Sequence, residues 1–174
     1  MNIFIRAKHW QLFLVLLGVM FSAQFLMFNS FMSESSPSSV TLILPTIVFA
    51  LLYFGWLCSV AIACSKALPL SLYSSPKPML VSLAYALIYL VINGKFFSGT
   101  HGQPPSYIFL FHLGAMAAIF YSLGFTAKQL AKLEQQQKVS FFSYSGPFFL
   151  FWFFPIGVWF IQPKVNQLLA GENA

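Results

Sequence analysis

The sequence is almost free of acidic residues. It contains no Asp, and its three Glu residues are Glu34 in a Ser-rich connector, Glu134 in a stretch rich in Gln and Lys, and Glu172 in the C-terminal tail. None of them lies inside an apolar stretch. Ionisable residues inside a membrane are costly and are kept where protons, ions or substrates are handled. The absence therefore argues against carboxylate-coupled transport, and it excludes lipid-modifying chemistry that depends on paired aspartates.

Charge of either sign is scarce. Only 7% of the residues are charged and 59% are hydrophobic, whereas a soluble domain carries roughly 25% charged residues. The mean hydropathy is +0.78, and no stretch is polar and long enough to fold as a separate aqueous domain. We therefore predict an all-α integral membrane protein in which residues 1–174 form a single helical bundle in the lipid bilayer.

Residues suited to metal or nucleophilic chemistry are also sparse. Cys58 and Cys64 share one apolar stretch, and they form neither a disulfide framework nor a metal-ligand spacing. His112 is the only histidine inside an apolar stretch, so a haem held between two histidines would lack its second ligand. Neither His-Glu-x-x-His nor Gly-x-Ser-x-Gly occurs. We predict a protein that is not an enzyme and has no cofactor. His112 is interpreted as a hydrogen-bonding residue, with proton handling or ligand binding as the alternative.

Five apolar stretches approach the length of about 20 residues that a helix needs to cross a membrane. The fourth continues into a polar, helix-favouring segment, which predicts a cytoplasmic extension to residue 138. The predicted spans are 10–32, 40–64, 78–97, 107–127 and 141–161.

The basic residues flank these stretches, so the net charge of +6 is better explained by orientation in a bilayer than by nucleic-acid binding. With five spans and a cytoplasmic N-terminus, Lys95 and Lys164 lie outside. Seven cations are then cytoplasmic: Arg6, Lys8, Lys66, Lys77, Lys128, Lys132 and Lys138. This bias predicts an N-in, C-out protein of a bacterial inner membrane.

The fifth stretch is interrupted by Gly146, Pro147, Pro155, Gly157 and Pro163. Proline inside a helix removes a backbone hydrogen bond, and in lipid the freed carbonyl must find another partner. The alternative to a fifth span is therefore a re-entrant or half-inserted aromatic segment, which leaves four spans and a cytoplasmic C-terminus.

Two of the stretches carry small residues at every fourth position. This spacing lets helix backbones approach closely in lipid, and it predicts that spans two and four form the centre of the bundle, with a homo-oligomer seam as the alternative. The packing residues are Gly55, Ser59 and Ala63 in span two, and Gly114, Ala118 and Ser122 in span four, which Thr126 continues.

The C-terminal quarter carries the most specific local pattern. Residues 128–134 read Lys-Gln-Leu-Ala-Lys-Leu-Glu, and residues 152–163 read Trp-Phe-Phe-Pro-Ile-Gly-Val-Trp-Phe-Ile-Gln-Pro. This part resembles the C-terminal part of an uncharacterised group of small multi-pass bacterial membrane proteins. The resemblance implies a bacterial inner-membrane protein and brings no catalytic residues.

The broken aromatic stretch is the predicted functional locus. Pro155 and Gly157 break the helix, and Gln162, Lys164 and Asn166 are expected to be exposed polar partners. Irregular backbone at membrane depth survives only when it is buried in protein or lines water. A kinked structural helix is the alternative.

Three functions compete. The first is a non-catalytic accessory, assembly or scaffold subunit that acts through helix contacts with a membrane-protein partner or a second copy. The second is a homo-oligomeric pore, for example a membrane-depolarising defence effector, which uncharged residues would line. The third is a small transporter or membrane enzyme. The candidate pore-lining residues are Gln24, Thr46, Ser59, Ser122 and Thr126.

Overall fold

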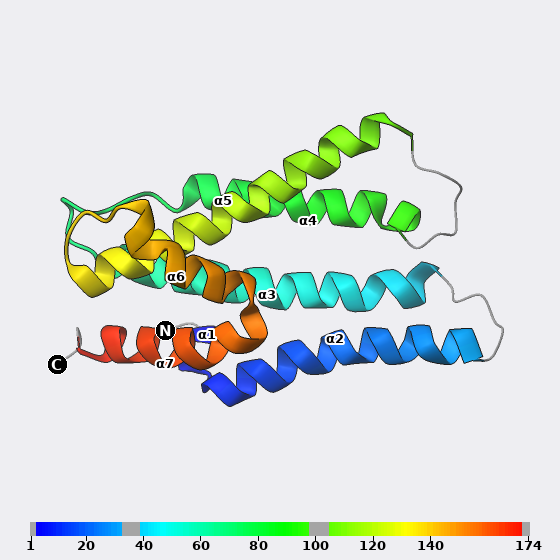
Figure 1. Cartoon of the computed structure of the whole chain (residues 1–174), viewed down its shortest axis with the longest axis horizontal. Helices are drawn as coiled ribbons and strands as arrows, with labels where there is room; N and C mark the ends of the chain where they lie inside the picture. Colours follow the sequence, from blue (N-terminus) through cyan, green and yellow to red (C-terminus); the bar gives the residue numbers. More distant parts are fainter. Residues whose placement is uncertain (1–2, 33–38, 98–104, 172–174) are drawn as a thin grey trace.

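The protein folds as a bundle of long helices that run back and forth along one axis (Figure 1). The computed structural model describes residues 3–32, 39–97 and 105–171, and every regular element within those ranges is an α-helix. Glu34 and Glu172 lie outside these ranges. The helices are α1 (Ile3–Arg6), α2 (His9–Met32), α3 (Ser39–Ala67), α4 (Lys77–Phe97), α5 (Tyr107–Gln135), α6 (Phe141–Trp152) and α7 (Phe154–Gly171).

Four of these helices, α2 to α5, are long and apolar enough to cross a membrane. They match the first four predicted spans to within three residues at each end, when the fourth is counted to the end of its predicted extension at residue 138. As predicted, α5 continues without a break beyond residue 127. It ends at Gln135, three residues earlier than expected, because Gln136 adopts a left-handed conformation (φ 52°) and its N–H donates to the Lys132 carbonyl at 2.8 Å.

The single helix predicted for residues 141–161 is wrong. The segment forms two helices, α6 and α7, which turn back on each other at Phe153. In Figure 1 the hairpin enters the bundle from the end where α5 finishes, turns about halfway along α3, and returns to the same end. The segment therefore folds as a helical hairpin, and both described ends, residues 3 and 171, lie at one end of the bundle (Figure 1).

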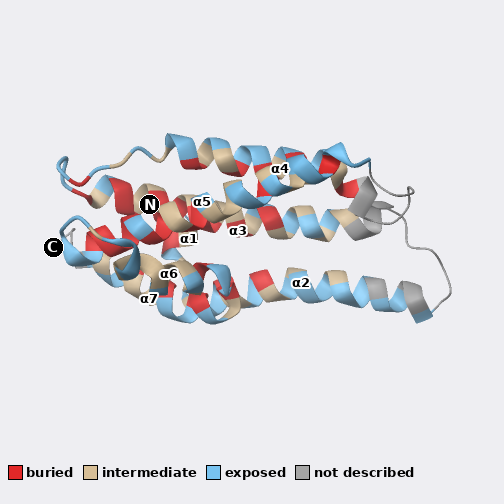
Figure 2. Ribbon diagram, turned by 45° about the horizontal axis from the view of Figure 1, so that its top comes forward, coloured by how far each residue is buried: buried red, intermediate tan, exposed pale blue. Residues whose placement is uncertain are grey.

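The helix α3 is the central element. It contacts α1, α2, α4, α5 and α7. In the most apolar stretch of α3, 44% of the residues are buried, against 11% in the corresponding stretch of α2 and 22% in that of α5. Burial is concentrated in the half of the bundle that holds the hairpin (Figure 2). The largest fully buried side chains there include Trp56 from α3, Leu130 from α5 and Phe151 from α6. The hairpin thus completes the core of that half.

The small residues in α3 and α5 mediate close packing inside the chain. A Cβ at Gly55 would lie 2.9 Å from the ring of Phe4 in α1, and a Cβ at Gly114 would lie 2.9 Å from the hydroxyl oxygen of Tyr85 in α4. The two glycines therefore face α1 and α4. Of the remaining predicted packing residues, Ser59 and Ser122 are buried, and Ala63 and Ala118 are half-buried.

Candidate functional site

The turn between α6 and α7 explains why the predicted breakers Pro155 and Gly157 are present. Phe153 ends α6 with its N–H donating to the Phe149 carbonyl at 2.8 Å, and the N–H of Gly157 donates back to the Phe153 carbonyl at 2.9 Å. Pro155 occupies the first turn of α7, where a missing N–H is tolerated. A Cβ at Gly157 would overlap the carbonyl oxygen of Leu150, so only glycine allows the two helices to cross there.

The end of α6 is fixed to α3 by an aromatic pair. The Tyr53 hydroxyl donates to the Phe151 carbonyl at 2.6 Å, which satisfies an acceptor that helix α6 leaves unpaired. The Trp56 ring packs against the Phe151 ring with centroids 5.3 Å apart. One carbonyl next to the hairpin tip is therefore paired within the protein, although Phe153 at the tip itself is 58% exposed.

Gln162 is not the exposed polar partner that the sequence predicted, because it is completely buried (0% exposed). Its Oε1 accepts a hydrogen bond from the Trp56 indole N–H at 2.9 Å. Its Nε2 donates to carbonyl oxygens at the end of α1, which belong to Phe4 (2.9 Å), Ile5 (3.3 Å) and Ala7 (3.1 Å). One amide thus joins α7, α3 and α1, and it satisfies carbonyls that the short helix α1 cannot pair itself.

The other two predicted polar residues lie next to this buried amide. Half-buried Asn166 places its Oδ1 3.3 Å from Nε2 of Gln162. Lys164 forms an ion pair with Glu134 at 2.6 Å, and both side chains are 38% exposed. The five-span prediction put Lys164 and Glu134 on opposite sides of the membrane. The hairpin returns Lys164 to the end where α5 finishes, which is why the two charges meet.

A second buried polar contact was not predicted from the sequence. Lys132 is only 7% exposed, and its Nζ donates to the Leu72 carbonyl at 3.0 Å and to the Ser74 hydroxyl at 2.8 Å. These contacts join α5 to the segment between α3 and α4. The sequence offers one signal for this role: Lys132 lies between two apolar residues, Ala131 and Leu133.

Gln129 is a further buried amide that sequence reasoning missed. It is 0% exposed, and neither Oε1 nor Nε2 has a hydrogen-bond partner among the described residues. A buried polar group without a partner costs about 1–3 kcal/mol. Gln129 lies one turn before Leu133 on α5 and outside the hairpin.

His112 lies apart from the hairpin. It is half-buried on α5 and packs against Tyr89 of α4, with ring centroids 5.8 Å apart. The other candidate site residues are on α6 and α7, so the structure does not bring His112 together with them. Within the described ranges, no group of three or more His, Cys, Asp or Glu residues is placed to hold a metal ion.

The hydroxyl groups considered as pore lining are engaged inside the chain. Ser59, Ser122 and Thr126 are buried, and each donates to the carbonyl four residues earlier, at 2.6 to 2.8 Å. Gln24 and Thr46 are exposed on α2 and α3. These five residues therefore do not share one surface.

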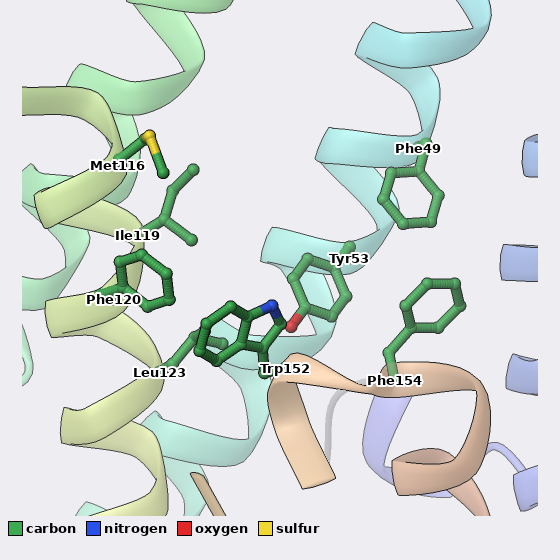
Figure 3. A pocket seen from close by; sticks show the side chains of 8 residues that line it. All are labelled: Phe49, Tyr53, Met116, Ile119, Phe120, Leu123, Trp152 and Phe154. Atoms are coloured by element: carbon green, nitrogen blue, oxygen red, sulfur yellow. The ribbon is translucent and has the colours of Figure 1, made fainter. Parts of the chain in front are cut away.

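A groove opens at the tip of the hairpin (Figure 3), with a volume of about 320 Å³. Its buried floor is formed by Tyr53, Leu123 and Phe154, and its exposed rim includes Met116 and Trp152. In Figure 3 the side chains from α5 form one wall, and Tyr53, Phe49 and Phe154 form the other. The complete lining is Phe49, Tyr53, Met116, Ile119, Phe120, Leu123, Trp152 and Phe154.

No protein family, curated protein or solved structure matches this chain.

Proposed function

We propose that this chain is a multi-pass protein of a bacterial inner membrane, with four spans and a re-entrant hairpin, and that it acts as a non-catalytic accessory or assembly subunit through helix contacts. The surface proposed for these contacts is the exposed face of α2. The proposal includes kinship with the group of small bacterial membrane proteins whose C-terminal segment this chain resembles.

The distribution of cations supports a cytoplasmic placement of the residue 3 and residue 171 ends. Of the nine Lys and Arg residues, only Lys95 belongs to the opposite end of the bundle. Cytoplasmic segments are enriched in Lys and Arg. The eight residues at the hairpin end are Arg6, Lys8, Lys66, Lys77, Lys128, Lys132, Lys138 and Lys164.

The observation that carries the proposal is the exposed face of α2. Only 11% of the residues in the apolar stretch of this helix are buried inside the protein. Its exposed residues include a row whose spacing alternates between four and three, the spacing by which two helices interlock side chains along a shared seam. The row is Leu14, Gly18, Phe21, Phe25, Phe28 and Met32.

Gln24 flanks this row and adds a polar contact. It is exposed, and its side chain makes no hydrogen bond with the described residues. An amide that faces hydrocarbon without a partner is unfavourable, and hydrogen bonds between membrane helices contribute about 1–2 kcal/mol in model peptides. A partner helix on this face would cover the row and pair the amide.

Photocrosslinking in the native membrane tests the proposal. A photoreactive residue at Phe25 should yield a protein adduct of discrete mass, whereas the same residue at Ile88, which is also exposed but lies on α4, should yield lipid adducts. Gln24→Leu should reduce the protein adduct at position 25. Lipid adducts alone at position 25, from a chain that is membrane-inserted, would refute the helix-contact function.

A further inference from the structure

A second groove lies between the two helices of the hairpin. It has a volume of about 500 Å³, and all of its lining residues belong to α6 and α7. Ile161 forms a buried floor, whereas Gly146, Trp159 and Gln167 on the rim are exposed. A Cβ at Gly146 would have no packing neighbour within 4 Å. This hairpin groove is therefore open to molecules in the surrounding membrane.

The hairpin groove is polar at one end and apolar at the other. Lys164 and Gln167 line the end nearer residue 171, and Leu150 and Trp159 line the end nearer the hairpin tip. Lys164 lies about 15 Å along α7 from its start at Phe154, which is half of a hydrocarbon core about 30 Å thick. Because the tip lies about halfway along α3 (Figure 1), Lys164 is at the level of the lipid head groups in the bilayer placement proposed above.

This gradient fits a lipid of the same leaflet as the hairpin. The apolar end stops at Leu150, in the last turn of α6, and so does not extend past the hairpin tip. An acyl chain that starts at the head-group level beside Lys164 reaches this end without crossing the middle of the bilayer.

The head-group end of the hairpin groove presents one charge of each sign. Lys164 and Glu134 form an ion pair at 2.6 Å, and both side chains are 38% exposed. A Lys ammonium has three N–H donors, and a carboxylate has about four acceptor sites, so each group can bind a further partner while the pair stays intact. A head group with only negative charge would bring a like charge to Glu134. The complementary head group carries a negative group for Lys164 and a cationic donor for Glu134.

We propose that the hairpin groove binds a phosphatidylethanolamine, a phospholipid whose head group joins a phosphate to a primary ammonium. The phosphate lies on Lys164, with the exposed Gln167 amide as a further donor, and the ammonium donates to Glu134. One acyl chain follows the groove between Leu150 and Trp159. The site rests on the bilayer placement proposed above, and it is a different surface from the exposed row on α2.

Native mass spectrometry of the full chain in a non-ionic detergent tests the lipid site. Phosphatidylethanolamine, phosphatidylglycerol and phosphatidylcholine with identical acyl chains are added in equal amounts. The phosphatidylethanolamine adduct should exceed the phosphatidylglycerol adduct about two- to fivefold, the range that half-exposed ion pairs contribute. It should also exceed the phosphatidylcholine adduct, because a quaternary ammonium has no N–H to donate to Glu134. Glu134→Gln should remove the preference over phosphatidylglycerol, and Lys164→Gln should reduce the adducts of all three lipids.

A pair of glycine variants shows whether the lipid lies in the hairpin groove. Gly146→Leu fills the groove from a position with open space around it, and it should remove most of the phosphatidylethanolamine adduct. Gly124→Leu is the matched control, because Gly124 also has no packing neighbour within 4 Å but lies on α5 outside this groove. It should leave the adduct unchanged.

Two results would overturn the inference. One is a phosphatidylglycerol adduct as large as that of phosphatidylethanolamine, and the other is a phosphatidylethanolamine adduct that survives Gly146→Leu. Either result refutes the lipid site alone, because the adducts are measured in detergent and do not involve the α2 face. A failed protein crosslink at Phe25 beside an intact phosphatidylethanolamine preference would refute the helix-contact function and support the lipid site.

Discussion

Replacing Gln162 by Leu should destabilise the protein by about 2–4 kcal/mol. The change removes the acceptor of the Trp56 indole N–H, and Trp56 and Gln162 are both 0% exposed. A buried donor left without a partner costs about 1–3 kcal/mol. The amide has two N–H groups for the α1 carbonyls that it reaches, and bonds between membrane helices average about 0.6 kcal/mol each. Burial of the apolar Leu side chain offsets part of the free energy lost with these hydrogen bonds.

Unfolding in mixed micelles, followed by circular dichroism as the denaturing detergent is increased, measures this loss. Gln167→Leu is the matched control, because Gln167 is an exposed amide on the same helix, and its replacement should change the free energy of unfolding by no more than about 0.5 kcal/mol. If Gln162→Leu costs no more than this control, the buried amide does not hold the three helices together.

A double-mutant cycle separates the hydrogen bond between Trp56 and Gln162 from the other hydrogen bonds of Gln162. Trp56→Phe removes the indole donor, and combined with Gln162→Leu it should cost less than the sum of the two single changes, with a coupling of about 1 kcal/mol or more. Additive losses would show that the 2.9 Å contact between the indole and the amide contributes nothing.

Three more predictions follow from the hairpin end of the bundle. Gly157→Ala should destabilise the detergent-solubilised protein strongly, because its Cβ overlaps a backbone carbonyl, whereas Gly146→Ala, with nothing within 4 Å, should be nearly neutral in the same unfolding assay. Gln129→Leu should stabilise the protein by about 1–3 kcal/mol, since it removes an unpaired buried amide; a loss of stability would mean that the amide has a partner. In a cysteine-free background, Lys164→Cys should react with an impermeant thiol reagent from the same membrane side as a tag before residue 3. Reaction from the opposite side would restore the fifth span.

The four long helices could be predicted from the sequence because hydropathy and length depend on local composition alone. The hairpin could not be predicted with the same certainty, because residues 141–161 are as apolar as a span, and the breakers Pro155 and Gly157 also occur in kinked helices. The distribution of charged residues along the sequence favours the hairpin over a fifth span. Five spans leave Lys164 on the side opposite seven other cations, whereas a hairpin returns it to them and to Glu134.

The role of Gln162 could not be inferred from local patterns. Its side-chain amide donates hydrogen bonds to the carbonyls of Phe4 and Ile5, which are 158 and 157 residues away in the sequence. No periodicity relates such distant segments. Polar residues after an apolar stretch usually mark its exposed end, which is why Gln162 and Asn166 were expected at the surface. The fold reverses this expectation by laying α7 over α1 and α3.

The scarcity of acids explains which polar contacts stabilise the bundle. Where carboxylates are scarce, buried donors bind neutral acceptors. Examples are the Gln162 amide oxygen, which accepts from Trp56, and the Leu72 carbonyl and Ser74 hydroxyl, which accept from Lys132. Gln162, the indole, Asn166 and the backbone carbonyls do not titrate. The contribution of Gln162 to stability should therefore be independent of pH. The free-energy difference between the wild-type protein and Gln162→Leu should stay constant from mildly acidic to mildly alkaline pH. A difference that changes with pH would require a titratable group in contact with this amide, and no such contact exists among the described residues.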